Sequence, residues 1–157
     1  MRFTSRSLEE THRAGAEIGR LLKRGDVVAL IGDLGAGKTS LVKGIAEGLG
    51  VKRAGERVTS PTFSLIHEYQ GREKIFHIDW YRLEEVKDAD LEMANECFGA
   101  RAVTLVEWAD RASGFLPERR IDIQMRHGGA STRFIQLAAH GLRYQPLVKY
   151  LRTRFGA

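Results

Sequence analysis

Hydrophobic and polar residues along the chain follow two spacings, one typical of strands and one typical of helices. The run Val27–Ile31 is apolar and rich in β-branched residues, which predicts a strand buried on both faces. Residues 40–49 place apolar side chains at helical spacing and are followed by Gly50, a residue type that commonly ends a helix. Glycine-rich residues 32–39 separate the two. The pattern predicts a strand, a glycine loop and a helix in succession.

The rest of the chain contains shorter elements of both kinds. Ser7 and Glu10 have the spacing of a capping box and predict a helix from Ser7 to Lys23. Two pairs of strands, each joined by a short polar turn, predict hairpins. The predicted strands are 62–69, 74–79, 102–107, 120–125 and 133–139, the further helical segments are 84–98, 110–115 and 144–151, and 51–56 is a polar loop. We therefore expect an α/β fold in which helices flank a mixed central sheet, formed by a single P-loop NTPase-like domain over residues 1–157.

The glycine loop carries the most specific chemical signal in the chain. Residues 32–39 read Gly-Asp-Leu-Gly-Ala-Gly-Lys-Thr and match the phosphate-binding pattern G-x-x-x-x-G-K-[ST] in full. Backbone amides of such a loop converge on phosphate oxygens at the positive end of the following helix. Lys38, a solvent-facing charge in the empty loop, is expected to reach the β- and γ-phosphates, and the Thr39 hydroxyl to ligate Mg²⁺. The predicted nucleotide-binding residues of this segment are Asp33, Leu34, Gly35, Ala36, Gly37, Lys38, Thr39 and Ser40.

Two acidic residues end apolar strands and are candidates for hydrolytic chemistry. Asp79 closes the predicted strand 74–79, and Glu107 closes 102–107. Acids at strand ends beside the P-loop strand would face Mg²⁺ or the attacking water, and the sequence does not say which acid serves which. The alternative is that both are surface acids. Lys38, Asp79 and Glu107 are thus the predicted catalytic residues, and Thr39, Asp79 and Glu107 the predicted metal ligands.

Two features of the sequence concern how the nucleotide is bound and which base it carries. They are residues 59–63 and the absence of a guanine-recognition motif. Hydroxyl side chains around Pro61, among them Thr62, suit a loop that closes on the γ-phosphate and Mg²⁺, although they are also ordinary turn residues. Proteins that select guanine usually carry Asn-Lys-x-Asp, whereas the only asparagine here, Asn95, precedes a glutamate. We therefore expect ATP or ADP rather than GTP.

Charge is unevenly distributed and excludes some classes of protein. Residues 1–110 hold 16 Lys+Arg and 18 Asp+Glu, whereas residues 111–157 hold 9 Lys+Arg and only 2 Asp+Glu. The basic C-terminal third, including the segment from about 141 to 157, favours a solvated or partner-facing surface over sequence-specific RNA binding. One cysteine, Cys97, excludes an internal disulfide. No apolar run approaches the ~20 residues of a membrane span and no secretory signal is evident, so we expect a cytoplasmic protein.

Four segments together resemble one known family. They are the P-loop, Ser-Pro-Thr-Phe at 60–63, His-Ile-Asp-Trp-Tyr-Arg at 77–82 and Val-Glu-Trp at 106–108. In order and spacing they are similar to the TsaE (YjeE) family, the bacterial P-loop ATPases of tRNA threonylcarbamoyladenosine (t6A) biosynthesis. The resemblance covers residues from about 8 to 140 and leaves the basic C-terminal segment outside.

The resemblance implies a function and partners. A TsaE-like protein binds ATP with Mg²⁺, hydrolyses it weakly alone, and acts with TsaB and TsaD, which attach threonylcarbamoyl to A37 of tRNA, so contact with tRNA is expected to be indirect. Carried onto this chain, Lys38 and Thr39 bind phosphate and metal, Thr62 belongs to a switch loop, and Asp79 and Glu107 serve Mg²⁺ and the water. Trp108 lies near the nucleotide or a partner, or is a core tryptophan.

Two other functions remain compatible with the residues. A small-molecule P-loop kinase shares the loop, but the acidic stretch 84–92 is a poor lid over phosphates. A nucleotide-gated RNA-binding module is suggested only by the basic C-terminal third. Arg82 and Arg111 are loosely placed candidates for a cation over the γ-phosphate, so slow hydrolysis by the isolated chain is expected.

Overall fold

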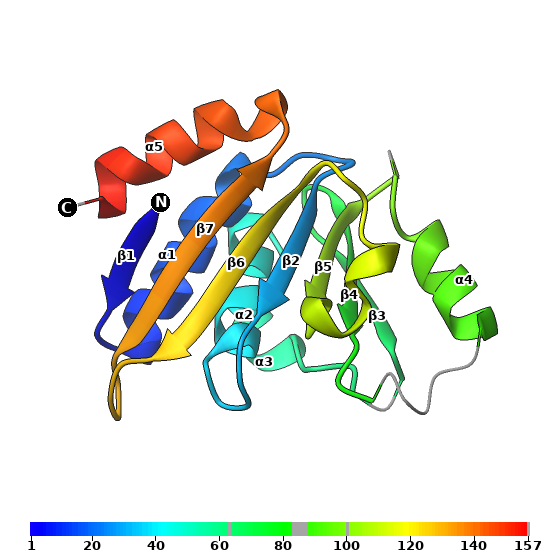
Figure 1. The fold of residues 1–157 in the computed structure, drawn as a ribbon, viewed down its shortest axis with the longest axis horizontal. Coiled ribbons are helices and arrows are strands. Elements are labelled where there is room, and N and C mark those ends of the chain that lie inside the picture. Colours follow the sequence, from blue (N-terminus) through cyan, green and yellow to red (C-terminus); the bar gives the residue numbers. More distant parts are fainter. Residues whose placement is uncertain (63, 83–87, 100, 157) are drawn as a thin grey trace.

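Seven strands form one mixed sheet in the order β1-β7-β6-β2-β5-β4-β3 (Figure 1). The computed structural model describes residues 1–62, 64–82, 88–99 and 101–156. The strands are β1 (Arg2–Ser5), β2 (Val27–Ile31), β3 (Ile66–Gln70), β4 (Lys74–Asp79), β5 (Val103–Glu107), β6 (Arg120–His127) and β7 (Arg133–His140).

Helices cover the two faces of the sheet unequally. The α-helices are α1 (Leu8–Leu21), α2 (Lys38–Gly48), α3 (Ala54–Arg57), α4 (Asp88–Glu96) and α5 (Gln145–Phe155), and the 3-10 helices are η2 (Ala109–Phe115) and η3 (Leu142–Tyr144). The larger core cluster joins α1, α2 and α5 to inward-facing residues of β2, β5, β6 and β7. A smaller cluster lies on the opposite face, where α4 and η2 meet β4 and β5. The expected mixed sheet with flanking helices is therefore confirmed.

The three central strand pairings are parallel, and they determine the edge of the sheet at which the candidate site lies. β2 pairs in parallel with both β5 and β6, and β5 pairs in parallel with β4. Within these ladders Leu30 lies beside Glu107, and Glu107 lies beside Asp79. Carboxyl ends of parallel strands meet at one edge, which is where open α/β sheets bind ligands. The P-loop and both predicted acids consequently share that edge.

Helix α2 is held against the sheet by an unusually close approach to α1. Both helices carry glycines four residues apart, Gly15 and Gly19 on α1 and Gly44 and Gly48 on α2. A Cβ added to Gly44 would lie 2.1 Å from the His12 carbonyl oxygen, and one added to Gly19 would lie 2.2 Å from that of Ile45. The two backbones are thus in direct contact, and α1 fixes the position of the helix that follows the P-loop.

The segment before β3 differs from the predicted strand 62–69. The observed strand begins only at Ile66, because the amides of Ser64 and Leu65 both donate to the Pro61 carbonyl and Leu65 has a φ of 64°. A turn therefore replaces the first half of the expected strand. It directs the hydroxyls of Ser60 and Thr62 toward the end of β4.

Other differences are smaller. Strand β1 has no counterpart among the predicted elements, since four residues at an edge are too short to show a pattern. The predicted loop 51–56 contains the start of α3. The last helix runs on to Phe155, beyond the predicted end at 151. Of the predicted helix 84–98, residues 84–87 lie outside the described residues. Across the described ranges, no helix has the length and apolar character to cross a bilayer.

The contact between α1 and α2 generates a stability prediction. Replacing Gly44 by Ala forces a methyl group into the α1 backbone, so we expect the free energy of unfolding to fall by about 1–3 kcal/mol. Gly55→Ala is the matched control, because a Cβ on Gly55 would meet no atom within 4 Å. Chemical denaturation of both variants measures the difference. Equal stabilities would contradict the close packing described.

Candidate nucleotide-binding site

The P-loop turns sharply between β2 and α2, and its glycines are needed for that path. Gly32 has a φ of 151°, and a Cβ there would lie 2.4 Å from the Met125 carbonyl oxygen on β6. Gly37, with a φ of 101°, precedes the first residue of α2, and no side chain caps this helix. The first-turn amides of α2 are therefore left for a ligand, an arrangement that favours an anion.

Lys38 is buried, which corrects the expectation of a solvent-facing charge. Its side chain is 4% exposed, and Nζ donates to the carbonyls of Gly32 and Asp33, the latter at 3.0 Å. Nζ also lies 3.7 Å from the centre of the Trp108 ring. Burial lowers the pKa of Lys38, and the charges of Glu107 and Asp79 oppose that shift. The loop folds back on its own lysine because the carbonyls and the ring replace the water that the ammonium loses.

Glu107 connects the P-loop helix to β4. Glu107 is 2% exposed, and its carboxylate accepts from the Thr39 hydroxyl at 3.1 and 3.0 Å. The same carboxylate lies 2.9 Å from His77 Nε2, a ring that is fully buried. His77, which was not among the predicted site residues, therefore contacts a predicted catalytic acid. Alternation along β4 places His77 on the face of Asp79, two residues further on.

Asp79 organises the loop that precedes β3. Asp79 is 2% exposed, and its Oδ2 accepts from Ser60 and, at 2.9 Å, from Thr62. The Tyr81 amide donates to Oδ1 at 2.8 Å. Two hydroxyls of the predicted switch loop, those of Ser60 and Thr62, are thus bound to one predicted acid. The two acids are buried in the site, so the alternative of surface acids is excluded.

These groups line one cleft at the carboxyl edge of the sheet, with a volume of about 520 Å³. That size falls within the range typical of small-molecule sites. The predicted residues that line it are Leu34, Gly35, Gly37, Lys38, Thr39, Ser40, Thr62, Asp79 and Glu107. Asp33 and Ala36 do not, and the Ala36 side chain instead belongs to the core. Leu8 and Arg133 line the cleft although no local motif marks them, since only the fold brings α1 and β7 to the loop.

Aromatic and cationic side chains stack at one wall of the cleft. Trp108 is partly exposed, lines the cleft and also packs against the smaller core cluster. The Arg111 guanidinium lies 5.0 Å from the Trp108 ring centre and 5.1 Å from that of Tyr81. Arg111 also donates to the Tyr81 carbonyl. The arginine is therefore engaged by this stack rather than directed into the cleft.

The donor set fits Mg²⁺ better than a metal held by protein alone. Among the described residues no group of three or more histidine, cysteine, aspartate or glutamate side chains could hold a metal ion. The cleft instead offers two buried carboxylates and the Thr39 hydroxyl, which are oxygen donors. Mg²⁺ is typically bound by one or two carboxylates together with phosphates and waters. The residues present fit a metal that arrives with a nucleotide.

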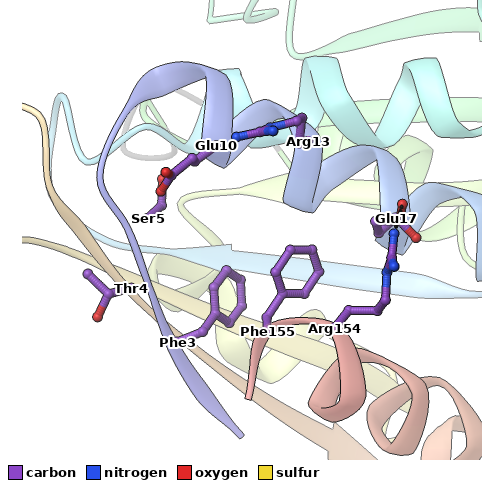
Figure 2. A pocket seen from close by; sticks show the side chains of 8 residues that line it. All are labelled: Phe3, Thr4, Ser5, Glu10, Arg13, Glu17, Arg154 and Phe155. Atoms are coloured by element: carbon purple, nitrogen blue, oxygen red, sulfur yellow. Dashed lines mark hydrogen bonds and ion pairs between the residues drawn. The ribbon is translucent and has the colours of Figure 1, made fainter. Parts of the chain in front are cut away.

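A second hollow, of about 310 Å³, lies between β1, α1 and α5 (Figure 2). Phe3 and Phe155 stack there with ring centres 5.1 Å apart, and Arg154 faces Glu17 at 3.5 Å. None of the predicted phosphate or metal residues lines it. These contacts attach the C-terminal helix to the edge of the sheet.

Comparison with known proteins identifies the family of this chain. The family described as "Threonylcarbamoyl adenosine biosynthesis protein TsaE" matches residues 5–135. A Treponema pallidum protein named "tRNA threonylcarbamoyladenosine biosynthesis protein TsaE" is 44% identical over 138 residues, covering 88% of this chain and all of that protein. A Bacillus subtilis protein of the same name is 42% identical over 144 residues, covering 91% of this chain and 88% of that protein. The crystal structure of Bacillus subtilis YdiB has a TM-score of 0.81 at 36% identity, covering 98% of this chain and 95% of that one. This chain belongs to the TsaE family.

Proposed function

We propose that this protein binds ATP with Mg²⁺, hydrolyses it slowly, and drives tRNA t6A modification together with TsaB and TsaD. The observation that carries the proposal is the convergence of Lys38, Thr39, Asp79 and Glu107 on one cleft at the carboxyl edge of the sheet. Membership of a family named for t6A biosynthesis supports the biological role.

Phosphate binding follows from the P-loop and the first turn of α2. The uncapped amides of this turn and the positive end of the helix would hold the phosphate oxygens. Lys38 would exchange the carbonyls of Gly32 and Asp33 for the β- and γ-phosphates. The exchange is favourable because a carbonyl dipole is a weaker partner for an ammonium than a phosphate charge.

The two acids would have different roles in ATP hydrolysis. Glu107 already contacts the Thr39 hydroxyl, so this pair would hold Mg²⁺, directly or through its waters. Asp79 binds Ser60 and Thr62 and would position their loop against the γ-phosphate. When bound, Mg²⁺ neutralises charge on the phosphates and so favours phosphoryl transfer.

Slow turnover by the isolated protein follows from the position of Arg111. Its guanidinium stacks on Tyr81 and Trp108 and donates to a backbone carbonyl. A cation placed over the γ-phosphate is worth roughly 10³–10⁵ in rate, so a site in which Arg111 stays in this stack would hydrolyse ATP slowly. We propose that docking on TsaB and TsaD completes the site and that hydrolysis resets the complex between tRNAs.

Truncation of Lys38 tests nucleotide binding. Lys38→Ala removes a charge-assisted contact to phosphate, so we expect ATP affinity to fall about 10- to 150-fold by calorimetry. Because Lys38 is buried and bonded, a lower melting temperature is also expected, and folding must be checked by circular dichroism. Lys43→Ala, a change on the same helix outside the cleft, should leave affinity unaltered. Unchanged ATP affinity in a folded Lys38→Ala protein would refute the phosphate site.

Replacement of Glu107 separates binding from turnover. Glu107→Gln keeps the shape of the side chain and an acceptor for Thr39 but removes the negative charge. We expect ATP affinity within a few-fold of the parent, and loss of both hydrolysis and repeated t6A formation by TsaB–TsaD. The readouts are phosphate release and t6A formed per complex over time.

The matched control for that variant is Glu96→Gln, an exposed position at the end of α4. It should hydrolyse ATP and sustain t6A formation at the parental rate. Parental hydrolysis by Glu107→Gln would place the catalytic acid elsewhere. If TsaB–TsaD formed t6A at the parental rate without this protein, the proposed role in modification would be rejected.

A further inference from the structure

Arg133, the first residue of β7, is a buried arginine whose hydrogen bonds among the described residues all go to carbonyl groups. The residue is 8% exposed. Nη1 donates to the carbonyls of Gly129, Ala130 and Thr132 at 3.4, 3.4 and 2.9 Å, and Nη2 to that of Gly35 at 3.5 Å. Most of these contacts are long, and within the described ranges the buried Nε has no hydrogen-bond partner. The guanidinium is therefore poorly satisfied for a group removed from water.

The positive charge of Arg133 also lacks a carboxylate partner within the described part of the chain. By contrast, three other arginines of the C-terminal third are paired with acids: Arg120 with Asp122 at 2.7 Å, Arg143 with Asp26 at 2.8 Å, and Arg154 with Glu17 at 3.5 Å. Arginine stays protonated when buried, so it cannot relieve the cost of desolvation by losing a proton. A buried charge without a counter-charge is unfavourable and points to an anion that binds at this position.

The location of Arg133 identifies that anion. Arg133 lines the same cleft as Lys38 and Thr39. A Cβ on Gly37 would lie 3.7 Å from Arg133 Nε, which places this donor beside the residue that directly precedes α2. His127, at the end of β6, lies 3.3 Å from the Leu34 carbonyl. The β6–β7 turn, residues 128–132, and its flanking strand ends thus contact the phosphate loop at two points.

We infer that Arg133 is a second cationic ligand of the nucleotide phosphates, bound to carbonyls of the β6–β7 turn until a nucleotide enters. The inference rests on the proposed function of the cleft. The phosphates concerned are those that ATP and ADP share, because Arg133 Nε lies beside Gly37 at the start of α2, where the loop would hold them. Lys38 would in addition reach the γ-phosphate, which ADP lacks. A bound nucleotide would supply the counter-charge that the described residues do not give Arg133.

The test compares stability and affinity in one set of variants. Arg133→Gln keeps a donor for the turn carbonyls and removes the charge. We expect dissociation constants for Mg–ATP and Mg–ADP to rise about 10- to 100-fold by calorimetry, while the melting temperature of the nucleotide-free protein stays level or increases. Arg133→Lys keeps the charge and should recover part of the affinity. Arg126→Gln, an exposed neighbour on β6, controls for net charge and should bind within about twofold of the parent.

The outcomes separate this inference from the function on which it rests. A lower melting temperature with unchanged affinity in Arg133→Gln would show a purely structural role and overturn the inference. If Lys38→Ala loses nucleotide while Arg133→Gln does not, only the role of Arg133 fails. If neither folded variant loses affinity, the nucleotide site itself is wrong.

Discussion

Parallel pairing of β2 with β5, and of β5 with β4, is the constraint on which the candidate site depends. The register places Glu107 beside Leu30 and Asp79 beside Glu107, so both acids project at the edge where β2 enters the P-loop. A slip of one residue in either ladder would turn an acid to the opposite face of the sheet. The close contact between α1 and α2 then fixes the height of the P-loop helix above that edge. Backbone geometry thus positions every polar group of the cleft.

In the cleft, the lysine and the hydroxyl groups are bound to partners within the protein that a ligand can replace. Lys38 rests on carbonyls and on Trp108, Thr39 on Glu107, and the hydroxyls of Ser60 and Thr62 on Asp79. Each of these polar groups has a hydrogen-bond or ring partner, but not the partner that would bind it most strongly. A nucleotide and its metal would offer stronger partners to several of these groups at once, because phosphates and Mg²⁺ carry full charges. Such an exchange would couple the nucleotide state to the position of the loop 59–62 and of the aromatic wall formed by Tyr81 and Trp108.

Local patterns predicted the parts of this fold whose signals lie in consecutive residues. The strand before the P-loop, the glycine loop itself and the acids Asp79 and Glu107 could be predicted, because strand, loop and strand-end acid are each marked in sequence. The burial of Lys38 could not be predicted, because its partners are backbone carbonyls and the ring of Trp108, which lies far away in sequence. The contact of His77 with Glu107 depends on register between strands, and Arg133 reaches the cleft only through the β6–β7 hairpin. The turn before β3 was missed because its residues have strand-like composition while the positive φ of Leu65 interrupts the strand.

The central claim is that nucleotide state controls association with the t6A machinery. It is tested most directly by measuring the affinity of this protein for TsaB–TsaD by surface plasmon resonance, with saturating Mg–ADP or with a non-hydrolysable ATP analogue and Mg²⁺. The account predicts at least a several-fold difference between the two states, with tighter binding in the ATP state, because a ligand shifts an equilibrium only through differential affinity. Equal affinities would contradict it, since ATP hydrolysis would then have no binding energy with which to drive a cycle.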